Sequence, residues 1–118
     1  MAGRLTTHVL DTARGLPAAG VKILLYRVTG NAQRKIAEAM TNENGRTEAP
    51  LLTGAAVKAG SYELVFGAGD YLRASGQAGS GILFLEDIPI RFGIGDPGAH
   101  YHVPLLLSPF GYATYRGS

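Results

Sequence analysis

The sequence predicts an all-β protein, an antiparallel sandwich of two sheets with about eight strands and one short helix. Apolar and polar residues alternate in many short segments, as they do in half-buried strands. The 17 glycines and 6 prolines punctuate these segments, and there is no regular strand–helix alternation of the kind that parallel α/β folds show. The length of 118 residues fits one domain, so we expect residues 1–118 to form a single sandwich.

The first half of the chain contains four predicted strands. Residues 5–12 and 21–28 are rich in β-branched and apolar side chains and are separated by a turn-rich link. Residues 33–41 fit a strand or a short helix, and the turns on either side favour the strand. After the strong turn signal Asn44-Gly45, residues 50–54 read as a short edge strand that begins with a proline.

The second half begins with a strand and the one predicted helix. Residues 61–66 alternate as a strand. Residues 69–75 favour a short helix, with Asp70 as its N-cap and Gly76 as its stop. Residues 83–94 then continue the alternation of a strand.

The last segment, residues 100–118, predicts a hairpin. On its first strand His100 and His102 face the same side, because side chains alternate at every residue. A turn at residues 108–111 leads into strand-favouring residues 112–115, which return the C-terminus toward the histidines. The terminus is therefore a candidate part of a site.

Composition excludes several classes of function. The net charge is only +2 and the basic residues are scattered, apart from Arg34-Lys35, so we expect no nucleic-acid partner. The chain has no cysteine, which excludes a thiol nucleophile, a disulfide and a thiolate metal site. No secretory h-region and no run of eighteen apolar residues occurs, which predicts no membrane partner and a cytoplasmic location, provided that no leader has been removed.

Three separate segments offer residues for chemistry: His8 in the first strand, Arg46 after the Asn-Gly turn, and His100 or His102 near the end. Taken singly, each also fits an ordinary solvated surface residue. The three histidines together also allow a zinc site of three imidazoles, because the spacing of His100 and His102 is possible on a strand.

Three motifs resemble those of the transthyretin-related proteins, specifically the 5-hydroxyisourate hydrolases. They are LTTHVLDT at residues 5–12, NGRT at residues 44–47, and residues 100–118, which end in Tyr-Arg-Gly-Ser. The resemblance covers nearly the whole chain, and it implies a transthyretin-like sandwich that hydrolyses 5-hydroxyisourate without a cofactor or metal.

The resemblance also implies which residues form the site. His102 precedes Val-Pro-Leu, as the catalytic imidazole of the family does, which leaves His100 as a structural neighbour. The implied catalytic residues are His8, Arg46, His102 and Ser118, and the implied substrate-binding residues are Arg46, Tyr115, Arg116, Gly117 and Ser118.

These residue types suit the opening of a lactam by water. Imidazoles titrate near neutral pH and can exchange protons with water or with the leaving nitrogen, and an arginine can hold carbonyl oxygens or an anion. The chain has neither a cysteine nor a Gly-x-Ser-x-Gly elbow, which favours direct attack by water over a covalent intermediate. The sequence leaves open which imidazole is the base and which is the acid.

The run of leucines at residues 105–107 breaks the alternation, which fits either a central strand of a monomer or a strand that also meets another subunit. The resemblance implies the second, a homotetramer built as a dimer of dimers with the substrate sites in a channel.

A noncatalytic carrier like transthyretin is the alternative function. Transthyretins have Lys, Glu and Thr in place of His8, Arg46 and His102, so the residues at these positions favour the hydrolase. A structural sandwich with no small-molecule site would leave the three motifs unexplained.

Overall fold

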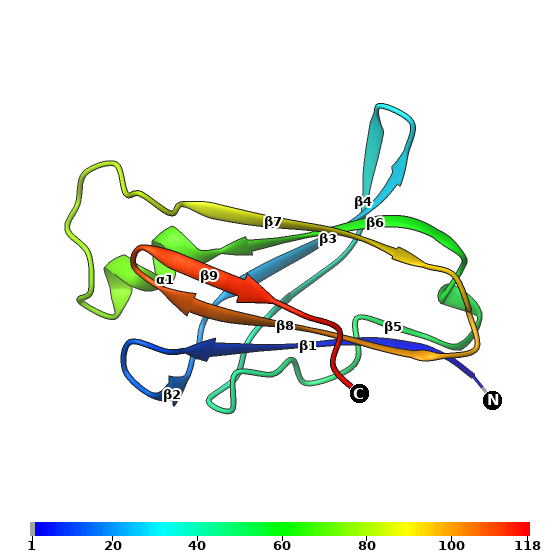
Figure 1. Ribbon diagram of the computed structural model, residues 1–118, viewed down its shortest axis with the longest axis horizontal. Coiled ribbons are helices and arrows are strands. Elements are labelled where there is room, and N and C mark those ends of the chain that lie inside the picture. The colour runs from blue at the N-terminus through cyan, green and yellow to red at the C-terminus, as the bar shows by residue number, and fades with distance from the viewer. Residues whose placement is uncertain (1) are drawn as a thin grey trace.

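Two β-sheets packed face to face build the protein (Figure 1). The computed structural model describes residues 2–118. The strand order is β2-β1-β8-β9 in sheet A, where β5 also pairs with β1, and β4-β3-β6-β7 in sheet B. Sheet A contains β1 (Arg4–Asp11), β2 (Leu16–Pro17), β5 (Leu52–Thr53), β8 (His100–Ser108) and β9 (Gly111–Thr114). Sheet B contains β3 (Lys22–Thr29), β4 (Ala32–Met40), β6 (Gly60–Gly67) and β7 (Asp87–Ile94).

The predicted sandwich is confirmed, and residues 33–41 form a strand rather than a helix. A short 3-10 turn, η1 (Gly54–Ala56), follows β5, and the helix α1 (Ala68–Ala74) follows β6. Within the described part of the chain no helix is long and apolar enough to cross a membrane. A cytoplasmic location stays a prediction from the sequence.

One strand pair departs from the antiparallel pattern. β1 and β8 run parallel, with Thr6 opposite His102 and Val9 opposite Leu105. Every other pair of named strands within residues 2–118 is antiparallel. The first strand of the chain therefore lies beside the penultimate one, and all of sheet B is inserted between them in the sequence.

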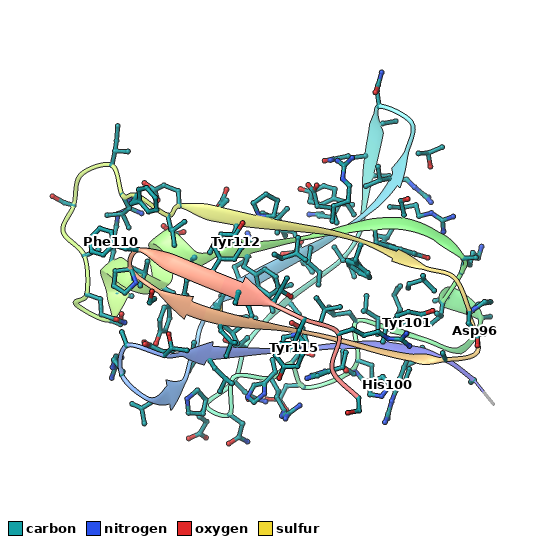
Figure 2. All side chains as sticks on the ribbon, viewed as in Figure 1. Asp96, His100, Tyr101, Phe110, Tyr112 and Tyr115 are labelled. Atoms are coloured by element: carbon teal, nitrogen blue, oxygen red, sulfur yellow. The ribbon has the colours of Figure 1, made fainter. Side chains whose placement is uncertain are left out.

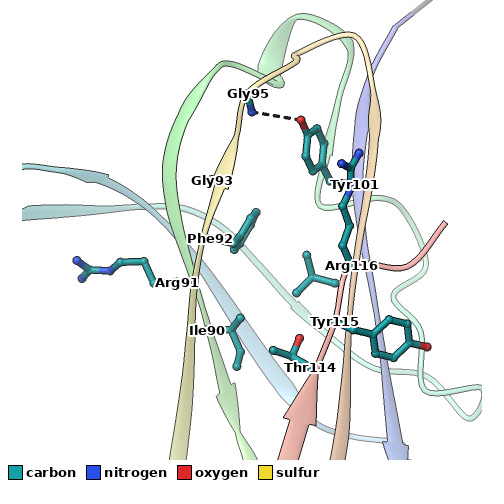
Figure 3. A pocket seen from close by; sticks show the side chains of 10 residues that line it. Ile90, Arg91, Phe92, Gly93, Gly95, Tyr101, Thr114, Tyr115 and Arg116 are labelled. Atoms are coloured by element: carbon teal, nitrogen blue, oxygen red, sulfur yellow. Dashed lines mark hydrogen bonds between the residues drawn. The ribbon is translucent and has the colours of Figure 1, made fainter.

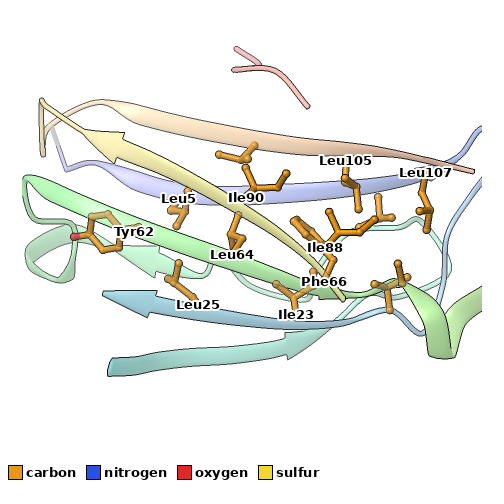
Figure 4. Packing of buried hydrophobic residues seen from close by; sticks show 14 of the residues in the cluster. Leu5, Ile23, Leu25, Tyr62, Leu64, Phe66, Ile88, Ile90, Leu105 and Leu107 are labelled. Carbon is orange, nitrogen blue, oxygen red and sulfur yellow. The ribbon is translucent and has the colours of Figure 1, made fainter. Parts of the chain in front are cut away.

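The core fills the space between the sheets (Figure 4). Alternate residues of β1 and β8 point inward, and Leu5, Val9, Leu105 and Leu107 are fully buried. Burying one such side chain stabilises the fold by about 1.5–3 kcal/mol. Sheet B meets them with Ile23, Leu25, Leu64, Phe66 and Ile88. Since every second residue of β1 and β8 is committed to this core, the remaining ones face outward.

The helix was predicted almost in place, but its cap was not. The N-cap residue is Gly67, and no side chain caps the helix. Asp70 was wrong as the cap: it lies within the first turn, 3.5 Å from the Arg73 guanidinium. The stop at Gly76 is confirmed, since its φ is +76° and its N–H donates to the Arg73 carbonyl.

The prediction that a strand begins at residue 83 was also wrong, because β7 begins only at Asp87. Glu86 is tied to the helix instead of the sheet. Its carboxylate accepts a hydrogen bond of 2.6 Å from Arg73, and its carbonyl accepts one from the Gly69 N–H. These contacts hold the preceding loop against α1.

A buried carboxylate joins β1 to the helix. Asp11 is 1% exposed and accepts hydrogen bonds from the Tyr71 hydroxyl at 2.6 Å, the Gln77 amide at 2.8 Å and the Arg14 N–H at 3.0 Å. Burial alone would raise the pKa of the Asp11 carboxyl, but these hydrogen bonds outweigh it and lower the pKa. Burial and the bond to Asp11 raise the pKa of Tyr71 to about 12.

We expect Tyr71→Phe to lower the free energy of unfolding by about 1.5–3 kcal/mol, since it removes a hydrogen bond to a buried carboxylate. Because the folded protein lowers the pKa of Asp11, this stabilisation is present above the unfolded pKa of about 3.9 and is lost as the pH falls through the folded value. Urea denaturation at fixed protein concentration measures it. Tyr26→Phe is the control, because no hydrogen bond of the Tyr26 hydroxyl is recorded within residues 2–118, and equal midpoints for both variants would contradict the prediction.

Candidate active site

The parallel pairing of β1 and β8 gathers all three histidines on the outer face of sheet A. His8 comes from β1 and His100 and His102 from β8. The ring centroids of His8 and His102 are 6.5 Å apart, and those of His100 and His102 are 6.2 Å apart. We call this surface the imidazole face.

A tight turn brings Arg46 to the same face. The Asn42 side chain accepts hydrogen bonds from the N–H groups of Asn44 and Arg46, which is an Asx-type turn. Gly45 follows with a φ of +74°, and its carbonyl accepts the Val9 N–H at 2.8 Å. Arg46 then forms an antiparallel bridge with His8.

The C-terminal segment lies beside His102, on the side of the His8–His102 pair opposite to Arg46. After β9 ends, the Gly117 N–H donates to the His102 carbonyl at 2.8 Å, and the two residues form a bridge. A Cβ at position 117 would lie 2.6 Å from Cδ2 of the His102 ring. Only glycine therefore lets the backbone pass this close to the imidazole, and Ser118 follows it directly.

Arg116 and Tyr115 lie beside the imidazole face and not on it, and the Arg116 guanidinium donates to the His100 carbonyl at 3.4 Å. The Arg116 guanidinium stacks over the Tyr101 ring at 4.2 Å, and the Tyr101 side chain points to the inner face of sheet A, opposite to His100 and His102. The Tyr101 hydroxyl accepts hydrogen bonds from the N–H groups of Gly95 and Asp96, of which Figure 3 draws the one from Gly95. Figure 2 shows Tyr101 and Asp96 at the same end of the sandwich as His100.

This second location is a hollow of about 480 Å³ between β7 and the C-terminal segment. Ile90, Phe92 and Thr114 contribute to its walls, and Figure 3 shows the Tyr115 ring turned away from Ile90 and Phe92. The structure thus brings His8, Arg46, His102 and Gly117 together, whereas Arg116 and Tyr115 border the hollow.

The surroundings of the three imidazoles lower the pKa of each. Burial, followed by the charge of Arg46, lowers the pKa of both His8 and His102. Burial and the charges of Arg4 and Arg116 lower the pKa of His100. A lowered histidine pKa makes the fold less stable as the pH falls below about 6.5, because the unfolded chain then binds more protons.

Two hydrogen-bonding groups contact the rings. Nε2 of His8 lies 3.0 Å from the Asn44 carbonyl oxygen. The Thr6 hydroxyl lies 2.8 Å from Nε2 of His100 and 2.8 Å from Nδ1 of His102. Sequence reasoning placed Thr6 on the same strand face as His8 but did not select it, since its partners come from a strand whose register was unknown.

The three imidazoles do not form a cage for a metal ion. Among the residues that the structure describes, no group of three His, Cys, Asp or Glu side chains is arranged to hold one. Two of the six ring nitrogens instead face the Thr6 hydroxyl.

The sequence shows which protein family has this sandwich and this site. The sequence profile described as the HIUase/Transthyretin family matches residues 5–117, and the chain belongs to that family.

Relatives that match nearly the whole chain are named as hydrolases. The chain is 60% identical over 116 residues to 5-hydroxyisourate hydrolase 2 of Rhizobium meliloti (98% of this chain, 97% of the relative). It is 53% identical to 5-hydroxyisourate hydrolase of Pseudomonas aeruginosa (98% and 92%). Among solved structures, it is similar to 5-hydroxyisourate hydrolase of Klebsiella pneumoniae, with a TM-score of 0.79 and 35% identity (98% and 94%).

Two other solved structures share the fold. Sea bream transthyretin in complex with thyroxine gives a TM-score of 0.85 at 29% identity, over 97% of this chain and 94% of that chain. An (S)-allantoin synthase gives a TM-score of 0.93 at 46% identity, and this chain (99% covered) spans only 44% of that protein.

We expect Arg46→Gln to raise the pKa of both His8 and His102, because a nearby positive charge is removed, while burial keeps both below about 6.5. Titration of the imidazole Cε1 protons by NMR measures the change. Arg34→Gln, on β4 in the other sheet, is the matched control. Unchanged histidine titrations in the Arg46 variant would show that its charge does not act on the rings.

Proposed function

We propose that this protein opens the lactam of 5-hydroxyisourate with water and yields 2-oxo-4-hydroxy-4-carboxy-5-ureidoimidazoline, as an enzyme of urate degradation. The observation that carries the proposal is the pair of imidazoles, His8 and His102, whose ring centroids lie 6.5 Å apart beside Arg46 and whose pKa values are both lowered. At this separation one ring can contact the attacking water and the other the leaving nitrogen of a bound substrate, each at a hydrogen-bond distance of about 2.6–3.2 Å. The full-length hydrolase relatives support this substrate.

Each residue of the site has a chemical task in this proposal. His8 and His102 exchange protons with the attacking water and the leaving ring nitrogen. Arg46, exposed at the rim and bridged to His8, holds substrate carbonyl oxygens and stabilises the developing oxyanion. Ser118 binds the water or the substrate through its hydroxyl.

Gly117, Tyr115 and Arg116 place that terminus. Gly117 fixes it to β8 through the bridge to His102. Arg116, the residue before Gly117, is held in place because its guanidinium stacks on the Tyr101 ring. We therefore propose that these three residues contribute to substrate binding indirectly, by fixing the position of Ser118.

A carrier of the transthyretin type is the second candidate, and the shared fold alone would permit it. Identity is 29% to the thyroxine-bound transthyretin but 60% to a hydrolase over the same length of chain. The hydrolase is therefore the function that we favour.

The decisive measurement generates 5-hydroxyisourate in situ from urate with urate oxidase and follows its ultraviolet decay. We expect the protein to accelerate the decay, and His8→Asn and His102→Asn each to reduce kcat by about 100-fold or more, since general acid–base catalysis contributes about 10²–10⁴-fold. The variants must remain folded, with the assembly of the parent. A decay rate equal to the uncatalysed one would exclude the enzyme and direct attention to ligand binding.

We further propose a homotetramer, a dimer of dimers, for the active form. β9 lies at one edge of sheet A and β7 at one edge of sheet B, and both edges are unpaired within residues 2–118. Such edges favour pairing with another chain. Leu106 and Leu10 extend the imidazole face as half-buried apolar side chains. Phe110, 80% exposed, lies in the β8–β9 turn at the end of the sandwich opposite to His100 (Figure 2).

Leu106→Glu should reduce both the assembly and the activity, because it places a charge on an apolar surface that the proposed interface would bury. Light scattering coupled to gel filtration gives the mass, and the decay assay gives the activity. Met40→Glu, on an exposed position of β4, serves as the control. A fully active monomer would refute the proposed role of the tetramer.

A further inference from the structure

The Thr6 hydroxyl lies within hydrogen-bond distance of two imidazoles, those of His100 and His102. Thr6 lies opposite His102 in the parallel ladder, and His100 is the next outward-facing residue of β8. One oxygen, Thr6 Oγ1, is 2.8 Å from Nε2 of His100 and 2.8 Å from Nδ1 of His102. Both distances are those of full hydrogen bonds.

Counting protons restricts how these bonds can run. A hydroxyl has one proton and two lone pairs, so Thr6 either donates to one ring and accepts an N–H from the other, or accepts an N–H from both. If both rings donated, the hydroxyl proton would have no acceptor among the hydrogen bonds recorded for residues 2–118. Two directions remain: from His100 through Thr6 to His102, or the reverse.

The backbone fixes the other side of the site. Nε2 of His8 faces the Asn44 carbonyl, which can only accept, so this nitrogen carries the proton. In neutral His8 the free nitrogen is then Nδ1, which has a lone pair and no proton. His8 can therefore act as a base. Another residue of the site must donate a proton to the leaving nitrogen.

A neutral imidazole is a very weak acid when it acts alone, because giving up its only N–H leaves an anion. Burial lowers the pKa of His102, and the neighbouring groups Arg46, His100 and His8 lower it further. His102 can therefore donate efficiently only if its second nitrogen gains a proton as the first one leaves. Thr6 stands at that second nitrogen.

We propose that Thr6 is a positioning residue that accepts the Nε2 proton of His100 and donates its own to Nδ1 of His102, so that His102 presents an Nε2–H as general acid opposite His8 as general base. This inference rests on the proposed hydrolase function and assigns the acid and base that the sequence left open.

The proton count of the step closes. The water oxygen attacks the lactam carbon and its proton passes to Nδ1 of His8, while the C–N bond breaks and the leaving nitrogen takes the Nε2 proton of His102. Thr6 gives its proton to Nδ1 of His102 and receives that of His100 Nε2. His100, half-exposed, takes a proton from solvent at Nδ1, and His8 later releases its extra proton to solvent.

Thr6→Val keeps the shape of the side chain and removes the hydroxyl, whereas Thr6→Ser keeps the hydroxyl. In the decay assay we expect Thr6→Val to lower kcat by about 10²-fold, the lower end of the acid–base contribution, with little change in KM, and Thr6→Ser to restore most of it. Thr7→Val is the matched control, because the Thr7 hydroxyl bonds the Val103 carbonyl on the buried side of the same strand. A Thr6→Val enzyme with the parent kcat would overturn the proposal.

A second measurement needs no turnover. Two-bond ¹H–¹⁵N NMR spectra distinguish the two neutral tautomers of histidine, and His102→Asn identifies the His102 signals. We expect Nε2–H for His102 in the parent and in Thr6→Ser, and a mixture of tautomers in Thr6→Val. An Nδ1–H tautomer in the parent would reverse the direction of the chain and refute the assignment, even if Thr6→Val does not fold.

The two measurements also separate this inference from the function it rests on. If the parent does not accelerate the decay, the hydrolase proposal and the catalytic part of the inference fail together, and the NMR spectra still test the proton arrangement. If the parent is active and the Thr6 variants behave alike, the inference alone fails.

Discussion

The parallel ladder between β1 and β8 is the contact on which both core and site depend. Its inward residues, such as Leu5 and Leu105, fill the space between the sheets. Its outward residues, His8 and His102, form the imidazole face. Because side chains alternate along both strands, a slip of one residue in either strand would exchange the buried residues with those of the imidazole face. The apolar core thereby holds the site in register.

Two glycines explain how further segments reach this ladder. At Gly45 a Cβ would collide with the Val9 carbonyl and touch Cδ2 of His8, and at Gly117 it would press on Cδ2 of His102. Each imidazole is thus backed by a backbone that carries no side chain. One glycine delivers Arg46 and the other delivers Ser118, on opposite sides of the histidine pair.

Local patterns predicted much of this structure. Alternation located the strands and the shared face of His100 and His102, and Gly76 marked the end of the helix correctly. The failures have nonlocal causes. Residues 83–94 were interpreted as one alternating strand, yet Glu86 is bound to Arg73 of the helix, a partner that no short-range pattern shows.

The site could be predicted only in part, because its residues also meet through nonlocal contacts. His8, Arg46 and His102 lie in separate motifs, and the resemblance to a family is what joined them before any geometry was known. Thr6 was out of reach, since its role depends on the parallel direction and register of β1 against β8. The placement of Arg116 over Tyr101 likewise follows from the packing of the C-terminal segment and not from its sequence.

The same ladder has a consequence for how the protein folds. Thr6 and His102, which meet across it, are 96 residues apart in the chain. β1 therefore cannot pair with β8 until the residues between the two strands have been synthesised. Contacts of such long range slow folding and leave strand edges open to aggregation meanwhile. The pairing that brings His8 and His102 to one face thus also leaves β1 without its neighbour β8 while the intervening residues are made.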